Sequence, residues 1–170
     1  MTLRHLLVMY SLDLLIVLLA VGAAVSANPE RHLVPFPRWQ LLLPGVLAFG
    51  GTVILLAYPE IRDLADPEVW MVGVAGLMIG GLRGWALTVE SDRAHRQVRV
   101  LRGSDAVWVG WMMVLFAAIQ GSIETGLRAE NPYESTAEFF MLLASGYLLG
   151  RSVVAWLRAR TATHHDLLEA

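Results

Sequence analysis

The sequence predicts an all-α integral membrane protein: a bundle of five transmembrane helices with a short cytoplasmic β-hairpin between the third and the fourth. Hydrophobic residues make up 56% of the 170 residues and charged residues only 16%, which is too apolar for an ordinary soluble domain. Five apolar stretches of about 20 residues each are long enough, at ~1.5 Å per helical residue, to cross a hydrocarbon core of ~30 Å. They are residues 6–27, 39–58, 69–87, 106–126 and 137–157.

The positions of the arginines indicate how the chain is oriented across the membrane. If all five cross the membrane, the connections between them alternate between its two sides. Ten arginines then fall on one side, in residues 31–38, 83–102 and 151–160, and three fall on the other. Cytoplasmic connections carry an excess of basic residues. The pattern therefore predicts an amino terminus outside and a carboxyl terminus in the cytoplasm of a bacterial inner membrane.

The first stretch also has features of a cleaved signal peptide. Arg4 and His5 precede an apolar run that ends in small residues. The run is longer than the roughly 7–15 residues of a signal core, and cleavage would place the arginine-rich residues 93–102 outside. We therefore interpret residues 6–27 as an uncleaved first span.

The connections differ in character. Residues 28–38 contain three prolines and favour extended or turn backbone, while residues 59–67 are short and acidic. In the third connection, residues 88–90 and 97–100 alternate polar and apolar side chains, which predicts a β-hairpin that leans on the membrane surface or on a partner. A basic amphipathic helix in the interface is the alternative. Residues 1–160 then form a single transmembrane domain, and residues 161–170 form a polar cytoplasmic tail.

Small residues recur at helical spacing in two of the predicted spans. Glycines every four residues lie on one helix face, where they allow another helix to approach closely. We expect this packing within the chain or between copies of it, with a glycine-lined substrate passage as the alternative. The residues are Gly76, Gly80 and Gly84 in the third span, and Gly146 and Gly150 in the fifth.

Polar side chains inside the predicted spans are the candidates for a buried polar site, because ionisable groups are costly in a bilayer. In the outer half they would form a pocket for a proton, a cation or a cationic ligand; in the inner half, two arginines would hold a phosphate or a lipid head group. The alternative is structural, with hydrogen bonds across helices and arginines that extend to the interface. The outer residues are Asp13, Gln120, Glu124 and Glu138, and the inner ones are Arg83 and Arg151.

The composition excludes several kinds of chemistry. The chain has no cysteine and no lysine, which excludes disulfides, thiolate catalysis and Schiff bases. Its histidines lie outside the spans or at their ends, so we expect no haem, no metal site and no other cofactor. The arginines belong to the membrane edges, so we expect no nucleic-acid binding. A pair of carboxylates, Asp13 and Glu124, is the remaining possibility for an intramembrane enzyme.

One part of the chain has a family pattern. A glycine-rich span is followed by a strand that ends in an acid at residues 89–92, a returning strand at residues 98–101, and Gly103 and Ser104 at the start of the next span. This quarter of the chain resembles the small multi-pass bacterial membrane proteins grouped around the cytochrome c biogenesis protein CcdC. The resemblance implies a small helical bundle without agreed catalytic residues. A redox-thiol role would require a partner, since the chain has no cysteine.

These observations favour a non-catalytic accessory, assembly or scaffold subunit of a membrane complex. The glycine faces and the hairpin would be its contact surfaces. Membrane lipids and other subunits, or a second copy of the chain, are the expected partners. The alternative is a small oligomeric transporter or channel for a proton, a cation or a small solute.

Overall fold

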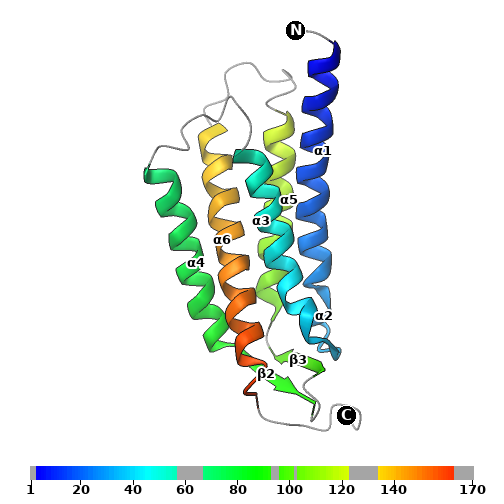
Figure 1. Cartoon of the computed structure of the whole chain (residues 1–170), viewed down its shortest axis with the longest axis vertical. Coiled ribbons are helices and arrows are strands. Elements are labelled where there is room, and N and C mark those ends of the chain that lie inside the picture. The colour runs from blue at the N-terminus through cyan, green and yellow to red at the C-terminus, as the bar shows by residue number, and fades with distance from the viewer. Residues whose placement is uncertain (1–2, 57–66, 93–95, 102, 123–133, 163–170) are drawn as a thin grey trace.

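The computed structural model describes residues 3–56, 67–92, 96–101, 103–122 and 134–162. The described residues are mostly helical, with a small sheet at one end of the bundle (Figure 1). Each of the five long helices coincides with one predicted apolar stretch to within a few residues, so the prediction of a helical bundle is confirmed. They are α1 (Leu3–Ser26), α3 (Leu43–Leu56), α4 (Pro67–Ala86), α5 (Ser104–Ser122) and α6 (Glu134–Arg158).

Three helical segments of the described chain are long and apolar enough to cross a membrane. They are Tyr10–Arg31, Arg38–Leu56 and Ala137–Arg158, and Ser104–Gln120 is a shorter apolar helix. Successive long helices run in opposite directions along the bundle, so α1 begins at the end opposite to the one where α6 ends (Figure 1). The connections from α1 to α3 and from α4 to α5 therefore meet at one end, together with the strands. We call it the sheet end.

Helix α6 is central to the bundle, because it packs against α3, α4 and α5. Helix α1 packs against α3 and α5, whereas the extensive contacts of α4 within the described chain are with α6. The main apolar core lies between α1, α3, α5 and α6 and includes Ile16, Ala48, Met113, Met141 and Leu148.

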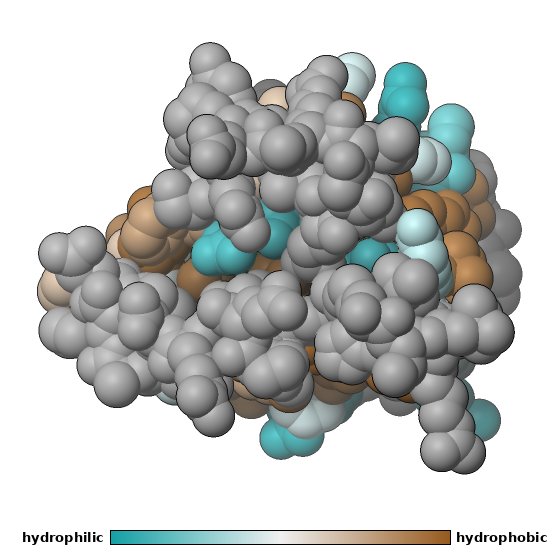
Figure 2. Space-filling model, turned by 90° about the horizontal axis from the view of Figure 1, so that it is seen from above, coloured by the Kyte–Doolittle hydropathy of each residue, from teal (hydrophilic) through white to brown (hydrophobic). Residues whose placement is uncertain are grey.

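The outer surface of the bundle is also apolar. Figure 2, which looks down on the end opposite the sheet, shows hydrophobic residues on the visible flanks. Large hydrophobic side chains are exposed on several helices, among them Leu14, Leu18, Val46, Val53, Met78 and Leu82. An exposed apolar surface of this extent is unusual for a soluble monomer.

Prolines shape the connection between α1 and α3. Pro29 lies in the first turn of the short helix α2 (Asn28–Arg31), where its missing N–H costs nothing. A 3₁₀ helix, η1 (Arg38–Leu42), then precedes α3, whose second residue is Pro44. The α-helix of this span therefore begins at Leu43, four residues later than the apolar stretch, and Pro44 occupies a first-turn position that suits its fixed φ.

The sheet has the strand order β1-β3-β2 and is antiparallel throughout. Strands β2 (Thr88–Ser91) and β3 (Gln97–Leu101) pair with Thr88 opposite Leu101, which confirms the predicted hairpin and excludes the amphipathic helix. The sequence did not predict the third strand, β1 (Phe36–Pro37), which pairs with β3.

The inner face of the sheet packs on the chain itself. Val98 and Val100 are fully buried in a second core cluster, together with Leu41 of η1, Leu87 and Ala155 of α6. The expectation that the hairpin leans on the membrane surface or on a partner is therefore corrected for this face. An isolated hairpin is marginally stable, and the third strand and the end of α6 supply the missing contacts.

Candidate functional site

The site with the densest polar contacts surrounds Arg151, whose side chain is 0% exposed. Its guanidinium group donates to both carboxylate oxygens of Glu30, with Nη2–Oε2 at 2.6 Å and Nη1–Oε1 at 3.3 Å. Its Nε donates to Asp105 Oδ2 at 2.9 Å, and Nη2 also donates to the carbonyl oxygen of Gly103 at 3.3 Å. The planar fork of arginine suits such two-sided carboxylate contacts.

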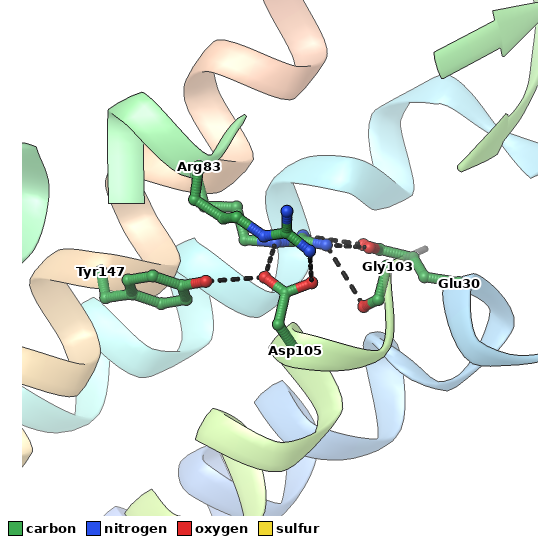
Figure 3. Close-up of polar contacts among 6 residues, drawn as sticks. Glu30, Arg83, Gly103, Asp105 and Tyr147 are labelled. Atoms are coloured by element: carbon green, nitrogen blue, oxygen red, sulfur yellow. Dashed lines mark hydrogen bonds and ion pairs between the residues drawn. The ribbon is translucent and has the colours of Figure 1, made fainter. Parts of the chain in front are cut away.

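Asp105 joins this arginine to two further side chains (Figure 3). The hydroxyl of Tyr147 donates to Asp105 Oδ2 at 2.6 Å, and Arg83 Nη2 lies 3.3 Å from Oδ1. Asp105 lies in the first turn of α5, where a negative charge is also favoured by the helix dipole. We call Glu30, Arg83, Asp105, Tyr147 and Arg151 the arginine cluster.

Asp105 precedes the apolar stretch that begins at Ala106, and its surroundings favour the carboxylate. Burial by itself would raise the pKa of this carboxyl group. The positive charge of Arg151 opposes that effect, and hydrogen bonds from Tyr147, Arg151 and Arg83 lower the pKa further. The net result is a pKa below the ordinary value, because the charged form is bonded on both oxygens.

The arginine cluster holds together elements that are far apart in the sequence. Glu30 comes from α2, Arg83 from the last turn of α4, Asp105 from the start of α5, and Arg151 from α6. Gly103 makes the approach of α2 possible, because a Cβ at this position would lie 2.6 Å from a carboxylate oxygen of Glu30. Each of the two carboxyl groups is paired with an arginine, so the cluster ties the sheet end of the bundle together.

The five glycines singled out in the sequence lie on the faces of α4 and α6 that contact each other. A Cβ at Gly76, Gly80 or Gly84 would run into the backbone carbonyls of Leu143, Tyr147 or Arg151, respectively. On α6, Gly146 and Gly150 lie equally close to the carbonyls of Gly73 and Leu77. These faces are used for packing within the chain, so they are not available as surfaces for a partner.

The other polar candidates lie at the far end of the bundle. Gln120 of α5 donates to Glu138 of α6, with Nε2 and Oε1 3.5 Å apart, and Asp13 is partly buried in the first half of α1. Glu124 lies outside the described residues. The structure thus brings Arg83 and Arg151 together and pairs Gln120 with Glu138, but the two groups lie at opposite ends of the helices.

Sequence reasoning missed three members of the arginine cluster: Glu30, Asp105 and Tyr147. A signal for the acids exists, because Glu30 is the only acid among residues 28–38 and Asp105 directly precedes an apolar stretch. No local pattern marks Tyr147 as a hydrogen-bond donor.

Two apolar cavities open on the sides of α4. One, of about 390 Å³, lies between α4, α5 and α6 and reaches Tyr147 of the arginine cluster. The other, of about 190 Å³, lies between α3, α4 and α6. In the part of the chain that the structure describes, no three His, Cys, Asp or Glu side chains are grouped as metal ligands.

Comparison of the chain with protein-family models, with curated proteins and with solved structures finds no match.

Proposed function

We propose that the chain is a multi-pass protein of a bacterial inner membrane, with its amino terminus outside and its carboxyl terminus in the cytoplasm. In this proposal all five long helices cross the bilayer. The apolar outer surface supports a lipid environment, because a soluble protein would have to expose the same side chains to water. The arginines of the sheet end support the orientation, since basic residues favour the cytoplasmic side.

Within that membrane, the proposed role is a non-catalytic accessory or scaffold subunit of a larger complex. The observation that carries this proposal is the arginine cluster. Arg151 donates to Glu30, Asp105 and Gly103, so the most buried charge of the described chain is used to hold its own helices together. A substrate-binding arginine would instead face a cavity with donors directed into it.

The position of the remaining polar side chains also favours this role over transport. Gln120 and Glu138 lie at the end opposite the arginine cluster, and the apolar core around Met113, Met141 and Leu148 separates the two groups. A path for a proton or a cation needs polar groups or water along its length. The described residues do not line up such groups across the bundle.

Helix α4 supplies the surface by which a partner would be contacted. It lies at the edge of the bundle and is held by α6, so most of its circumference faces outwards. Met71, Val74, Met78 and Leu82 are all exposed on it. Burial of these side chains against another transmembrane helix would not disturb the glycine faces, which are occupied by α6.

The test uses single cysteines, for which the chain provides a cysteine-free background. Met78→Cys is the probe on α4, and Leu18→Cys on α1 is the matched control, because both side chains are exposed. In native membranes we expect a bifunctional thiol–amine reagent to give one discrete cross-linked product from Met78→Cys and none from Leu18→Cys. The absence of any product, together with a purified chain that is monomeric, would overturn the scaffold proposal.

Two further measurements separate the other parts of the proposal. Gln97→Cys should resist an impermeant thiol reagent in intact cells and react after the cells are opened; reaction in intact cells would reverse the orientation. Asp13→Asn should leave proton flux into reconstituted vesicles at the background of empty vesicles, as for the wild-type chain. A wild-type flux that Asp13→Asn abolishes would instead establish the transporter.

A further inference from the structure

The larger cavity is a groove that runs along the side of the bundle between α4, α5 and α6. Its volume of about 390 Å³ lies in the range of small-molecule sites, which is roughly 300–1,000 Å³. Apart from the ring of Tyr147 at one end, its walls are hydrophobic. The main lining residues are Ile79, Trp108, Met112, Phe116, Phe140 and Leu143.

The groove is long enough to hold most of one lipid acyl chain. Along α5 it extends from Trp108 to Phe116, which at ~1.5 Å per residue is about 12 Å. Half of a ~30 Å hydrocarbon core is about 15 Å, so the groove follows most of one leaflet. At its far end Phe116 and Phe140 stack with ring centroids 4.7 Å apart.

The end of the groove nearest the sheet is polar and includes the ion pair between Arg83 and Asp105. Tyr147 lines the groove there and bonds Asp105, and Arg83 lies one helical turn beyond Ile79 on α4. The side chain of Arg83 is 38% exposed, in contrast to the fully buried Arg151. Asp105 accepts hydrogen bonds from Arg151, Tyr147 and Arg83, with Arg83 Nη2 3.3 Å from Oδ1, so a phosphate at Arg83 would share this partly exposed guanidinium group with Asp105.

Exposed tryptophans lie at the same level. Trp108 is 66% exposed and Trp85 is 70% exposed. Trp108 follows Asp105 closely in the sequence, and Trp85 follows Arg83. Tryptophan is enriched where the head groups of a bilayer meet its hydrocarbon core. Arg83 would therefore lie at head-group depth, with the groove extending from it into the acyl-chain region.

We propose that the groove binds one acyl chain of an anionic phospholipid from the leaflet on the sheet side, with the phosphate of that lipid at Arg83. The inference rests on the membrane location proposed above. The charge of the sheet end favours an anionic lipid, because Arg31, Arg96 and Arg160 are also exposed there. Arginine suits the phosphate group, to which its N–H groups donate in pairs.

The test measures quenching of Trp108 by brominated lipids. The full chain is reconstituted in phosphatidylethanolamine vesicles that contain a minor fraction of phosphatidylglycerol, with bromine on the acyl chains of one lipid or the other. The Trp108 signal is obtained as the difference from Trp108→Phe. We expect brominated phosphatidylglycerol to quench the Trp108 fluorescence more strongly than its mole fraction in the vesicles would predict.

Two pairs of variants locate the lipid. Arg83→Gln should lower the relative affinity for phosphatidylglycerol about tenfold, or about 1.4 kcal/mol, whereas Arg96→Gln removes the same charge from the same end and should not. Ile79→Phe narrows the groove and should reduce the quenching, whereas Leu82→Phe, on the exposed face of α4, should not.

Each outcome decides the proposal. The proposal is overturned if brominated phosphatidylglycerol quenches Trp108 only in proportion to its mole fraction. It is also overturned if Arg83→Gln and Arg96→Gln change the affinity for phosphatidylglycerol equally. In either case the lipid would only surround the bundle as solvent. Flotation of the chain with the vesicles is measured first. A chain that does not float would overturn the membrane location itself, which is a separate failure from the loss of lipid selectivity in a chain that does.

Discussion

Helix α6 is held on two sides by opposite means. Towards α4 the contact is between backbones: Gly76, Gly80 and Gly84 lie against carbonyl groups of α6, with no room for a side chain. Towards α2 and α5 the contact is between charges, with Arg151 between Glu30 and Asp105. Arg151 takes part in both, because its carbonyl faces Gly84 while its guanidinium group forms the arginine cluster.

The difference matters in the lipid environment that we propose. There, apolar side chains gain little by leaving lipid for protein, so helices associate through close packing and polar contacts. On the side that faces α4, helix α6 is held by close packing. On the side that faces α2 and α5, it is held by polar contacts. The packing side should respond to added volume and the charged side to the loss of a partner, which makes the two contributions separable by mutation.

The largest effect is expected from Arg151→Met. The variant keeps most of the side-chain volume but leaves Glu30, which is 2% exposed, without its counter-charge. Removing one partner of a buried pair costs about 3–5 kcal/mol. We expect a fall of this size in the free energy of unfolding, measured by circular dichroism during titration of mild-detergent micelles with sodium dodecyl sulfate.

The double variant Arg151→Met/Glu30→Leu is the control for this result. It removes both charges, so it should recover a large part of the lost stability. A cost below about 1 kcal/mol for Arg151→Met alone would contradict the burial of the pair, since that is the range of exposed ion pairs.

A smaller but still large effect is expected from Gly80→Leu. The new Cβ would meet the carbonyl of Tyr147, so α4 and α6 must separate. Overpacking costs about 1–3 kcal/mol, and we expect the upper part of this range because the obstacle is backbone. Gly73→Leu on the same helix is the matched control, since nothing lies within 4 Å of a Cβ there. Equal losses of unfolding free energy in the two variants would rule out the glycine packing.

The smallest effect is expected from Tyr147→Phe. This variant keeps the ring in the groove and removes the hydroxyl that donates to Asp105 at 2.6 Å. Loss of a hydrogen bond to a charged group costs about 1.5–3 kcal/mol, and we expect the lower end because Arg151 and Arg83 still neutralise Asp105. Tyr10→Phe, on the exposed surface of α1, should leave the same denaturation midpoint unchanged. No difference between the two would show that the hydroxyl contributes nothing.

Much of the secondary structure could be predicted from local patterns. Long apolar stretches give the helices, as for α4, predicted at residues 69–87 and observed at Pro67–Ala86. Alternation of Val98 and Val100 with arginine gives β3. The third strand could not be predicted in this way, because two residues, Phe36 and Pro37, carry no period and become a strand only through β3.

The candidate site was less predictable. Arg151 was a candidate because a charged side chain inside an apolar stretch is costly to place in a bilayer. Arg83 was a candidate for the same reason, and it was expected at a similar depth in the membrane. The partner of Arg151 could not be found, since Glu30 lies 121 residues away in a connection with no helical or strand pattern. The glycine spacing indicated a close helix contact, but it did not say whether the contact lay within the chain or between copies.

The sequence by itself determined where the five long helices lie, which connection is a hairpin and which connections carry the arginines, but it did not predict the short helices α2 and η1. These properties depend on hydrophobicity, spacing and charge along short stretches of chain. Only the tertiary structure decided which helix meets each glycine face and which acid neutralises Arg151. Those contacts join residues from distant parts of the chain, and they are fixed by how whole helices pack rather than by any local preference.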